Sequence, residues 1–276
     1  TRYWRDWSSD VCSSDLEPGR LAYGRLNTAP YLQRAIDTVL ACPQPPTAVV
    51  LTGDLTDFGR SQEYAHLREL LSPLTCPVYL LAGNHDDPAQ MRESFPEHTY
   101  LGTEGALQYS VPVGDLQLIA LDTTTPRQSH GTLCETRLQW LASALEDSRD
   151  RPVVVAMHHP PFTTLIGHMD KIGLLQGSEA LAQLISQYPN VERVICGHLH
   201  RAIDVRFGGT LASTCPAPAH QVVLDLHRDA ASQWNLEPGG FRIHAWQPGT
   251  GLVSHMRPVG DFEGPYPFHK SGALID

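Results

Sequence analysis

The chain has 276 residues, of which 41% are apolar and 18% charged, and its formal net charge is −10 with histidine counted as neutral. This composition is typical of a globular protein and excludes a disordered one. No run approaches the roughly 20 apolar residues of a membrane-spanning helix, so no membrane partner is expected. The negative charge gives no electrostatic reason to expect a nucleic acid polymer as a partner.

The six cysteines are scattered along the chain without a Cys-x-x-Cys pair. Their spacing predicts neither a thiolate metal site nor a disulfide framework, so reduced thiols are expected. The sequence also lacks a charged and then apolar leader with a small-residue cleavage site. We therefore predict a cytoplasmic protein.

Residues 1–16 differ in texture from the rest of the chain. They contain two of the five tryptophans, a Ser/Asp run, and no period of either two or 3.6 residues. We expect an irregular leader here, without a strand. The segment resembles translated sequencing-adapter read-through, and the alternative is a genuine disordered leader. Residues 17–276 are predicted to form a single domain.

From residue 28 onward, helical and strand-like patterns alternate. Helices are expected at 28–42, 61–71, 135–147 and 177–188, and strands at 48–51, 78–82, 116–122, 152–157 and 191–196. After residue 210, short runs predict antiparallel strands at 210–213, 221–226, 241–246 and 252–256, with a hairpin turn at 248–251. This order predicts an α/β fold in which two mixed β-sheets pack as a sandwich with helices outside.

Four short polar signatures stand at the ends of predicted strands. They are Gly53-Asp54-Leu55-Thr56-Asp57, Gly83-Asn84-His85-Asp86, His158-His159 and Gly197-His198-Leu199-His200. Asp, Asn and His without Cys suit Mn, Fe, Zn or Co better than Ca, Mg or a soft metal. A pair of such ions generates a hydroxide at neutral pH and stabilises an in-line displacement, which is the chemistry of phosphoester hydrolysis.

These signatures resemble, in order and in strand context, four of the five motifs of the calcineurin-like metallophosphoesterases. The family has a four-layer αββα fold and binds two metal ions. The resemblance implies that Asp54 bridges the two ions and that His200 binds the first. The ligands it implies for the second ion are Asn84, His158 and His198.

The resemblance also implies roles for residues that do not bind metal. His85 would stabilise the phosphoryl oxygens and protonate the leaving alkoxide, with Asp86 as the carboxylate that orients it. Asp57 would fix the loop or a ligand. His158 is favoured over His159 as the ligand, because it comes first after the strand, and His159 would then line the pocket or support a ligand.

Within the family, the sequence is similar to the bacterial class III cyclic-nucleotide phosphodiesterases and the related glycerophosphodiesterases. The segments that carry this similarity are 19–24, 158–162, 168–174 and 219–221. They place His168, Met169 and Asp170 near the leaving group. As a class, the histidines His130, His168, His220, His244 and His255 are more often surface or core residues than ligands.

The fifth family motif, Asp-x-His, is missing from the N-terminal segment. By spacing it would fall near residues 13–16, where Ser13 and Asp15 stand in place of its Asp and His. Asp10 or Asp15 could substitute as a ligand; otherwise the first metal site is impaired.

The resulting hypothesis is a metal-dependent phosphodiesterase that hydrolyses a cyclic nucleotide or another small anionic phosphodiester. A phosphomonoesterase of the same fold and an inactive metal- or nucleotide-binding homologue remain as alternatives. The residues do not define the oligomeric state, and a homodimer is left open.

Overall fold

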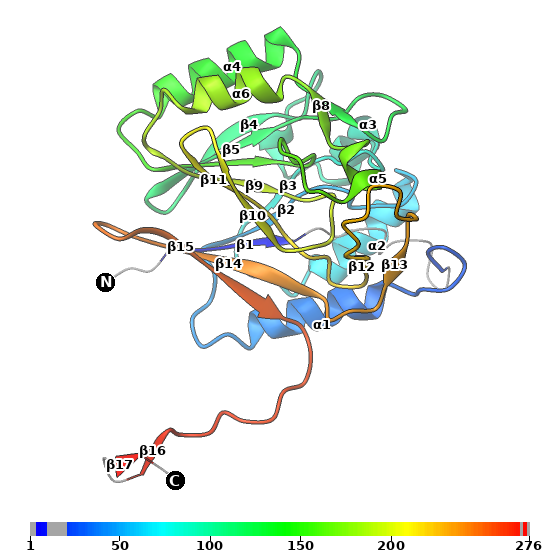
Figure 1. The fold of residues 1–276 in the computed structure, drawn as a ribbon, viewed down its shortest axis with the longest axis vertical. Coiled ribbons are helices and arrows are strands. Elements are labelled where there is room, and N and C mark those ends of the chain that lie inside the picture. Colours follow the sequence, from blue (N-terminus) through cyan, green and yellow to red (C-terminus); the bar gives the residue numbers. More distant parts are fainter. Residues whose placement is uncertain (1–3, 10–20, 271–272, 275–276) are drawn as a thin grey trace.

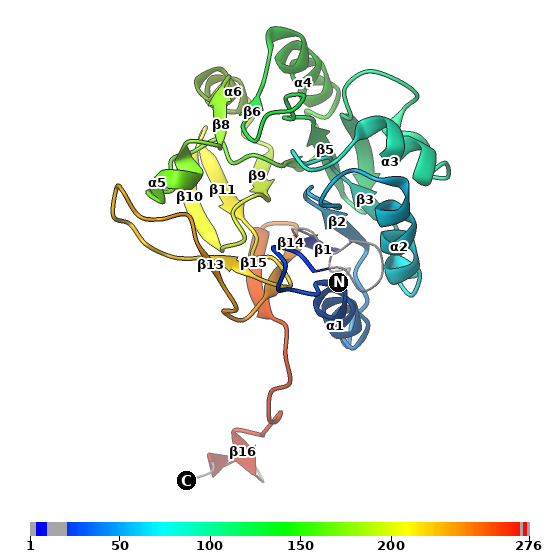
Figure 2. The same ribbon diagram turned by 90° about the vertical axis from the view of Figure 1, so that its right-hand side faces the viewer.

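The computed structural model describes residues 4–9, 21–270 and 273–274. Most strands form two large sheets, one of five and one of six strands, that pack face to face (Figure 1). Helices lie on the outer side of each sheet, so that Figure 2 shows the layers helix, sheet, sheet and helix. The predicted α/β sandwich of two mixed sheets with flanking helices is confirmed.

The five-stranded sheet has the order β15-β14-β1-β2-β3. Its strands are β1 (Trp4–Ser9), β2 (Ala48–Leu51), β3 (Val78–Leu80), β14 (Gly240–Gln247) and β15 (Gly251–Pro258). β1, β2 and β3 are parallel, and their register places Ser9 beside Leu51 and Leu51 beside Leu80. All three strands therefore end at one edge of the sheet. The helices α1 (Ala29–Leu40), α2 (Ser61–Leu71) and α3 (Pro88–Ser94) belong to this half of the molecule.

The six-stranded sheet has the order β10-β11-β9-β7-β5-β4. Its strands are β4 (Tyr109–Val113), β5 (Leu116–Leu121), β7 (Val153–Met157), β9 (Val191–Cys196), β10 (Ile203–Phe207) and β11 (Thr210–Thr214). The central strands β5, β7, β9 and β11 are parallel, and the two edge strands are antiparallel to their neighbours. The helices α4 (Glu135–Asp147) and α6 (Ser178–Ile185) cover the outer face.

The six-stranded sheet is buried on both faces, and successive side chains of its central strands enter different parts of the core. In β7, Val154 and Ala156 belong to the core between the sheets, whereas Val155 and Met157 pack in the layer beneath α4 and α6. Successive side chains of a strand point to opposite faces, so an uninterrupted apolar run is what a doubly covered strand requires.

Smaller elements complete the described part of the chain. They are the helices η1 (Thr99–Leu101) and α5 (Gly167–Asp170) and the ribbons β6 (Gly131–Thr132) with β8 (Leu174–Gln176), β12 (Gln221–Val222) with β13 (Trp234–Asn235), and β16 (His269–Lys270) with β17 (Ala273–Leu274). The last ribbon stands away from the body at the end of an extended segment (Figure 1). Among the described residues, the helices are all too short or too polar to cross a bilayer.

Two predictions about strands are wrong. The segment 1–16 was expected to contain no strand, yet residues 4–9 form β1, which pairs with β2 on one side and β14 on the other. Backbone hydrogen bonds to strands on both sides stabilise β1, although the local sequence pattern does not predict a strand. The run 221–226 forms only the short strand β12, with one further backbone hydrogen bond, from the N–H of Val223 to the carbonyl oxygen of Gln233.

Arg242 links the two sheets. Its side chain extends from β14 of the first sheet, is buried, and donates from Nε to the carbonyl oxygen of Thr214 in β11 at 2.8 Å. Its Nη2 donates to Oδ2 of Asp204 in β10 at 2.9 Å. A guanidinium can satisfy a buried carbonyl and a carboxylate together because its donors form a fixed fork.

We predict that Arg242→Met lowers the free energy of unfolding by about 1.5 to 3 kcal/mol, since it keeps the apolar stem but removes the donors to Thr214 and Asp204. Urea denaturation measures the change. Arg257→Met, at an exposed position on the neighbouring strand, is the control and should fall within about 0.5 kcal/mol of the wild type. Equal losses in the two variants would contradict the linking role of Arg242.

Candidate metal centre and active site

Four loops meet where the parallel strands of both sheets end. The loops after β2 and β3 come from the first sheet, and those after β7 and β9 come from the second. Parallel strands bring their carboxyl ends to the same edge of a sheet, so polar residues that follow each strand gather there. The four sequence signatures are therefore brought together, as their positions at strand ends predicted.

His158 is the point at which the loops converge. Its Nε2 lies 3.2 Å from Oδ2 of Asp54, 3.2 Å from Oδ1 of Asn84 and 3.1 Å from Nδ1 of His198. Its other nitrogen, Nδ1, lies 2.8 Å from the carbonyl oxygen of Thr52, which holds the ring from the far side. One carboxylate, one amide oxygen and two imidazoles thus face a common point.

This donor set fits a divalent transition ion. Carboxylate and amide oxygens with imidazole nitrogens are ligands that Mn, Fe, Zn and Co accept. A carbonyl oxygen behind a ligating histidine fixes the ring's orientation and tautomer, as the Thr52 carbonyl is placed to do for His158. The four residues predicted to bind the second ion, Asp54, Asn84, His158 and His198, form this cluster.

Burial and the neighbouring histidines together shift the site towards the protonation states that a metal needs. Burial favours neutral Asp54, but the neighbouring histidines, His158 first, outweigh it and hold the pKa of Asp54 well below its usual value. Burial lowers the pKa of His198 to about 3 and holds the pKa of His200 well below its usual value. An ionised carboxylate and neutral imidazoles have the lone pairs that coordinate an ion.

The ligand loops adopt backbone conformations that bulky residues rarely occupy. Asp54, His198 and His200 have φ angles of 50°, 70° and 50°, in the left-handed region. A Cβ at Gly83 would lie 2.1 Å from Oδ1 of Asp54, and one at Gly53 would lie 2.5 Å from Nδ1 of His158. Strain of this kind persists where the surrounding structure fixes it, and it concentrates at functional sites.

His200, the predicted ligand of the first ion, lines the same cavity as Asp54, Asn84, His85 and His198. This cavity has a volume of about 220 Å³. The ring of His200 is held by Nδ1, which lies 3.2 Å from the carbonyl oxygen of His220. The position of the missing Asp-x-His motif, where Ser13 and Asp15 stand, and the two candidate substitute ligands, Asp10 and Asp15, lie outside the described residues.

His85 is oriented by Asp57 and not by Asp86, which the sequence analysis had assigned to this task. Nδ1 of His85 lies 3.0 Å from the carbonyl oxygen of Asp57 and 3.6 Å from its Oδ1. The negative charge of Asp54 is the largest influence that raises the pKa of His85, against a smaller opposing effect of burial. His85 is therefore biased towards the protonated form that an acid requires.

Asp86 holds two ligand loops together instead. Its carboxylate accepts hydrogen bonds from the backbone N–H groups of Leu55, Thr56 and Gly83 and from the hydroxyls of Thr56 and Tyr64. Burial, with repulsion from Asp54, raises its pKa to about 6, so the group is ionised at neutral pH and accepts these bonds. His85 and Asp86 are adjacent in sequence, but their side chains contact different groups, and the sequence alone does not reveal this.

The remaining predicted residues divide between the cavity and its surroundings. His159 is fully buried, with Nδ1 2.8 Å from the hydroxyl of Thr123, and it forms with His158 and His198 a cluster whose ring nitrogens lie within 4.8 Å of one another. Burial holds the pKa of His159 well below its usual value. His168 and Met169 line the metal cavity.

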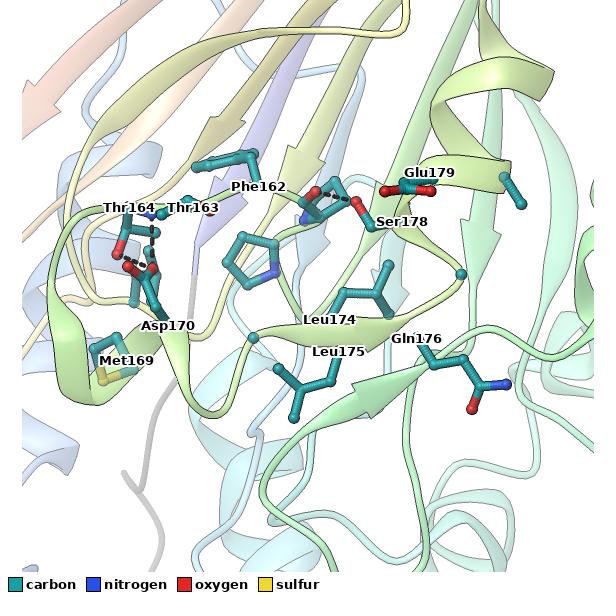
Figure 3. Close-up of a pocket in the computed structure, with 16 residues that line it drawn as sticks. Phe162, Thr163, Thr164, Met169, Asp170, Leu174, Leu175, Gln176, Ser178 and Glu179 are labelled. Atoms are coloured by element: carbon teal, nitrogen blue, oxygen red, sulfur yellow. Dashed lines mark hydrogen bonds between the residues drawn. The ribbon is translucent and has the colours of Figure 1, made fainter.

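Asp170 does not line the metal cavity. Figure 3 shows its carboxylate bonded to Thr164, whose backbone N–H and hydroxyl both donate to Oδ1 at 2.7 Å. Oδ2 accepts from the backbone N–H of Leu165. Asp170 therefore fixes the turn before α5 and lines a neighbouring cavity, whereas His168 and Met169, predicted with it near the leaving group, line the metal cavity.

Sequence reasoning missed the aromatic residues Tyr23, His220 and Trp234 of the metal cavity. His220 was grouped with ordinary core or surface histidines, yet its ring centroid lies 4.5 Å from that of His200. Tyr23 and His220 both fall in segments that carried the family resemblance, 19–24 and 219–221, and this was the available signal. Trp234 lies in a stretch without any motif.

Comparison with known proteins shows the family to which the chain belongs. Residues 9–202 match the family described as calcineurin-like phosphoesterase. A probable glycerophosphodiester phosphodiesterase of Arcobacter nitrofigilis is 35% identical over 259 residues, covering 94% of this chain and 95% of the relative. A 3′,5′-cyclic adenosine monophosphate phosphodiesterase of Pseudomonas aeruginosa is 32% identical over 186 residues, covering 66% and 65%. The chain belongs to the calcineurin-like phosphoesterase family.

Solved structures support the same fold. A dimetal phosphatase from Danio rerio superposes with a TM-score of 0.62 at 16% identity, over 93% of this chain and 99% of that one. A purple acid phosphatase from yellow lupin gives a TM-score of 0.64 at 12% identity, over 100% of this chain and 53% of that one. At such low identity the likeness concerns the fold alone.

The role of Asp86 generates a prediction about stability. Asp86→Asn replaces one acceptor oxygen by an NH₂ group that faces N–H donors, which should cost about 1 to 3 kcal/mol of unfolding free energy. Thermal unfolding by circular dichroism measures it, with the exposed Asp115→Asn as a control. If Asp86→Asn unfolded at the wild-type temperature, Asp86 would not be holding the loops.

Proposed function

We propose that this protein is a metal-dependent phosphodiesterase that hydrolyses a small anionic diester, with a cyclic nucleotide as the preferred class. The observation that carries this proposal is the convergence of Asp54, Asn84 and His198 on Nε2 of His158. Similarity to relatives named as glycerophosphodiester and cyclic-nucleotide phosphodiesterases supports a diester as the substrate.

Asp54, Asn84, His158 and His198 would hold one ion, and Asp54 and His200 would contribute to a second. When bound, such ions supply a nucleophile at neutral pH and offset the charge that develops on the phosphoryl oxygens. The protein's own contribution is to hold these donors in fixed positions, through the Thr52 carbonyl behind His158 and the Asp86 carboxylate beneath the loops.

His85 would act as the general acid. The Asp57 carbonyl oxygen can only accept, so Nδ1 of His85 carries the proton of that hydrogen bond. Nε2 is then the nitrogen that remains to protonate the leaving oxygen. Because the side chain is 43% exposed and lines the cavity, a substrate can reach it.

A comparison of two chromogenic esters tests the proposed activity. Bis(p-nitrophenyl) phosphate, a diester, should be hydrolysed faster than p-nitrophenyl phosphate, and a chelator should abolish both reactions. Faster hydrolysis of the monoester would favour the phosphomonoesterase alternative. No hydrolysis of either ester in the presence of Mn or Fe would favour an inactive binding protein.

The acid role of His85 predicts an effect that depends on the leaving group. His85→Ala should lower kcat roughly 10² to 10⁴-fold for a diester with an alkyl leaving group, which needs a proton. The loss should be much smaller for a 4-nitrophenolate leaving group, which departs without one. Steady-state kinetics on the two diesters measures the contrast, and equal losses on both would rule out the acid role.

We further propose that the two metal sites differ in strength. The first site has only Asp54 and His200 among the described residues, and a site with two protein ligands binds a transition ion weakly. The second site has four convergent ligands. One ion should therefore stay with the chain under conditions that remove the other.

Elemental analysis after dialysis against metal-free buffer tests this asymmetry. The wild type should retain about one ion per chain, His198→Ala should lose it, and His200→Ala should keep it, because that residue belongs to the weak site. Two tightly held ions in the wild type, or loss of the retained ion in His200→Ala, would contradict the proposal.

A further inference from the structure

A second, larger cavity adjoins the metal cavity. It has a volume of about 820 Å³ and is lined by residues of the loop before α1, among them Tyr23 and Arg25, and of the segment around β13, among them Ser232, Gln233 and Trp234. Tyr23, Ser232, Gln233 and Trp234 also line the metal cavity, so the two spaces share a wall. The outer cavity is large enough for an organic group the size of a nucleoside.

Aromatic rings lead from the metal ligands into this outer cavity. The centroid of His220 lies 4.5 Å from that of His200, and Trp234 lies 5.5 Å from His220. The rings of Tyr23 and Trp234 are 5.4 Å apart and inclined by only 32°. Rings this close, although tilted against each other, present an aromatic surface beside the metal cavity.

The loop that carries Tyr23 is fixed in place. Its turn is closed by the pairing of Ala22 with Leu26, and these two residues pack with Ala219 in a small apolar cluster that Trp234 also contacts. Tyr23 has a φ of 52°, an unfavourable conformation for a bulky residue, and its side chain is 57% exposed. A strained, exposed aromatic residue beside a catalytic cavity is typical of a ligand contact.

We propose that the outer cavity binds the nucleobase of a nucleotide whose phosphate lies at the metal centre. The base would stack on the Trp234 and Tyr23 surface, and Arg25 would donate to its acceptor atoms. The proposal rests on the proposed phosphodiesterase function and adds to it the residues that would hold the base. The positive charge of Arg25 disfavours the other group that aromatic residues commonly bind, a quaternary ammonium.

A binding experiment tests the subsite without relying on turnover. Adenosine 5′-monophosphate and glycerol 3-phosphate share the phosphate and differ in the alcohol that it esterifies, adenosine or glycerol, so calorimetric titration of the metal-loaded wild type isolates the contribution of the nucleoside. Stacking of a base on an aromatic side chain predicts tighter binding of the adenosine ligand by on the order of ten- to a hundredfold. Equal affinities would overturn the proposal, as would tighter binding of phosphocholine, a monoester with a quaternary ammonium, than of the adenosine ligand.

Three variants locate the effect. Trp234→Ala should remove most of the preference for adenosine 5′-monophosphate over glycerol 3-phosphate, whereas Trp234→Phe, which keeps a ring, should retain most of it. Tyr23→Gly suits the positive φ at this position, so it should reduce the preference without disturbing the fold. Unfolding temperatures identify any variant that fails to fold. A preference that persists in both well-folded Trp234→Ala and Tyr23→Gly would overturn the proposal.

Hydrolysis separates this inference from the function on which it rests. The ratio of kcat/KM for 3′,5′-cyclic AMP to that for an aliphatic glycerophosphodiester should fall at least tenfold in Trp234→Ala. An unchanged ratio counts against the subsite while leaving the diesterase function intact. Preferential binding of adenosine 5′-monophosphate without hydrolysis of any diester would contradict the proposed diesterase function and still support the nucleobase site.

Discussion

The contact between His158 and Asp54 is the interaction on which the site depends. Asp54 follows a strand of one sheet and His158 follows a strand of the other, and Nε2 of the histidine lies 3.2 Å from Oδ2 of the aspartate. The two sheets must therefore pack in one relative position for the cluster to exist. The Arg242 hydrogen bonds to Thr214 and Asp204 fix the same two sheets at a different place. The packing of the two sheets therefore also determines the geometry of the metal centre.

Burial and the neighbouring charges determine the protonation states of the residues at this site. A carboxylate removed from water is unfavourable alone, and the surrounding histidines keep Asp54 ionised. The same burial keeps His198 and His200 neutral. The site is therefore a set of donors whose charges balance best when a cation is present, which is why metal binding and the stability of these loops are expected to be coupled.

The sequence revealed the parts of this centre that follow directly from strand ends. Asp54, Asn84, His158 and His198 each come within four residues of the end of an apolar strand, and parallel strands bring such residues together. The roles of Asp57 and Asp86 could not be predicted in this way. Both flank the active-site loops, and only the path of the backbone decides that Asp86 turns to Leu55, Thr56 and Gly83 while Asp57 faces His85.

Other features depended on contacts between distant segments. Residues 4–9 have no strand-like period, and they become β1 because β2 and β14 pair with them on both sides. Trp234 reaches the metal cavity only because β13 pairs with β12, directly after His220. Local pattern carries no information on such pairing, so the aromatic wall of the outer cavity could be found only in three dimensions.

The central claim is that residues from both sheets hold a catalytic ion at one point. A crystal structure of the manganese-loaded protein, with anomalous scattering measured at the metal edge, tests it most directly. The account predicts an ion about 2.0 to 2.2 Å from Nε2 of His158 and from oxygens of Asp54 and Asn84. An ion bound instead among His158, His159 and His198, without Asp54 or Asn84, would contradict it.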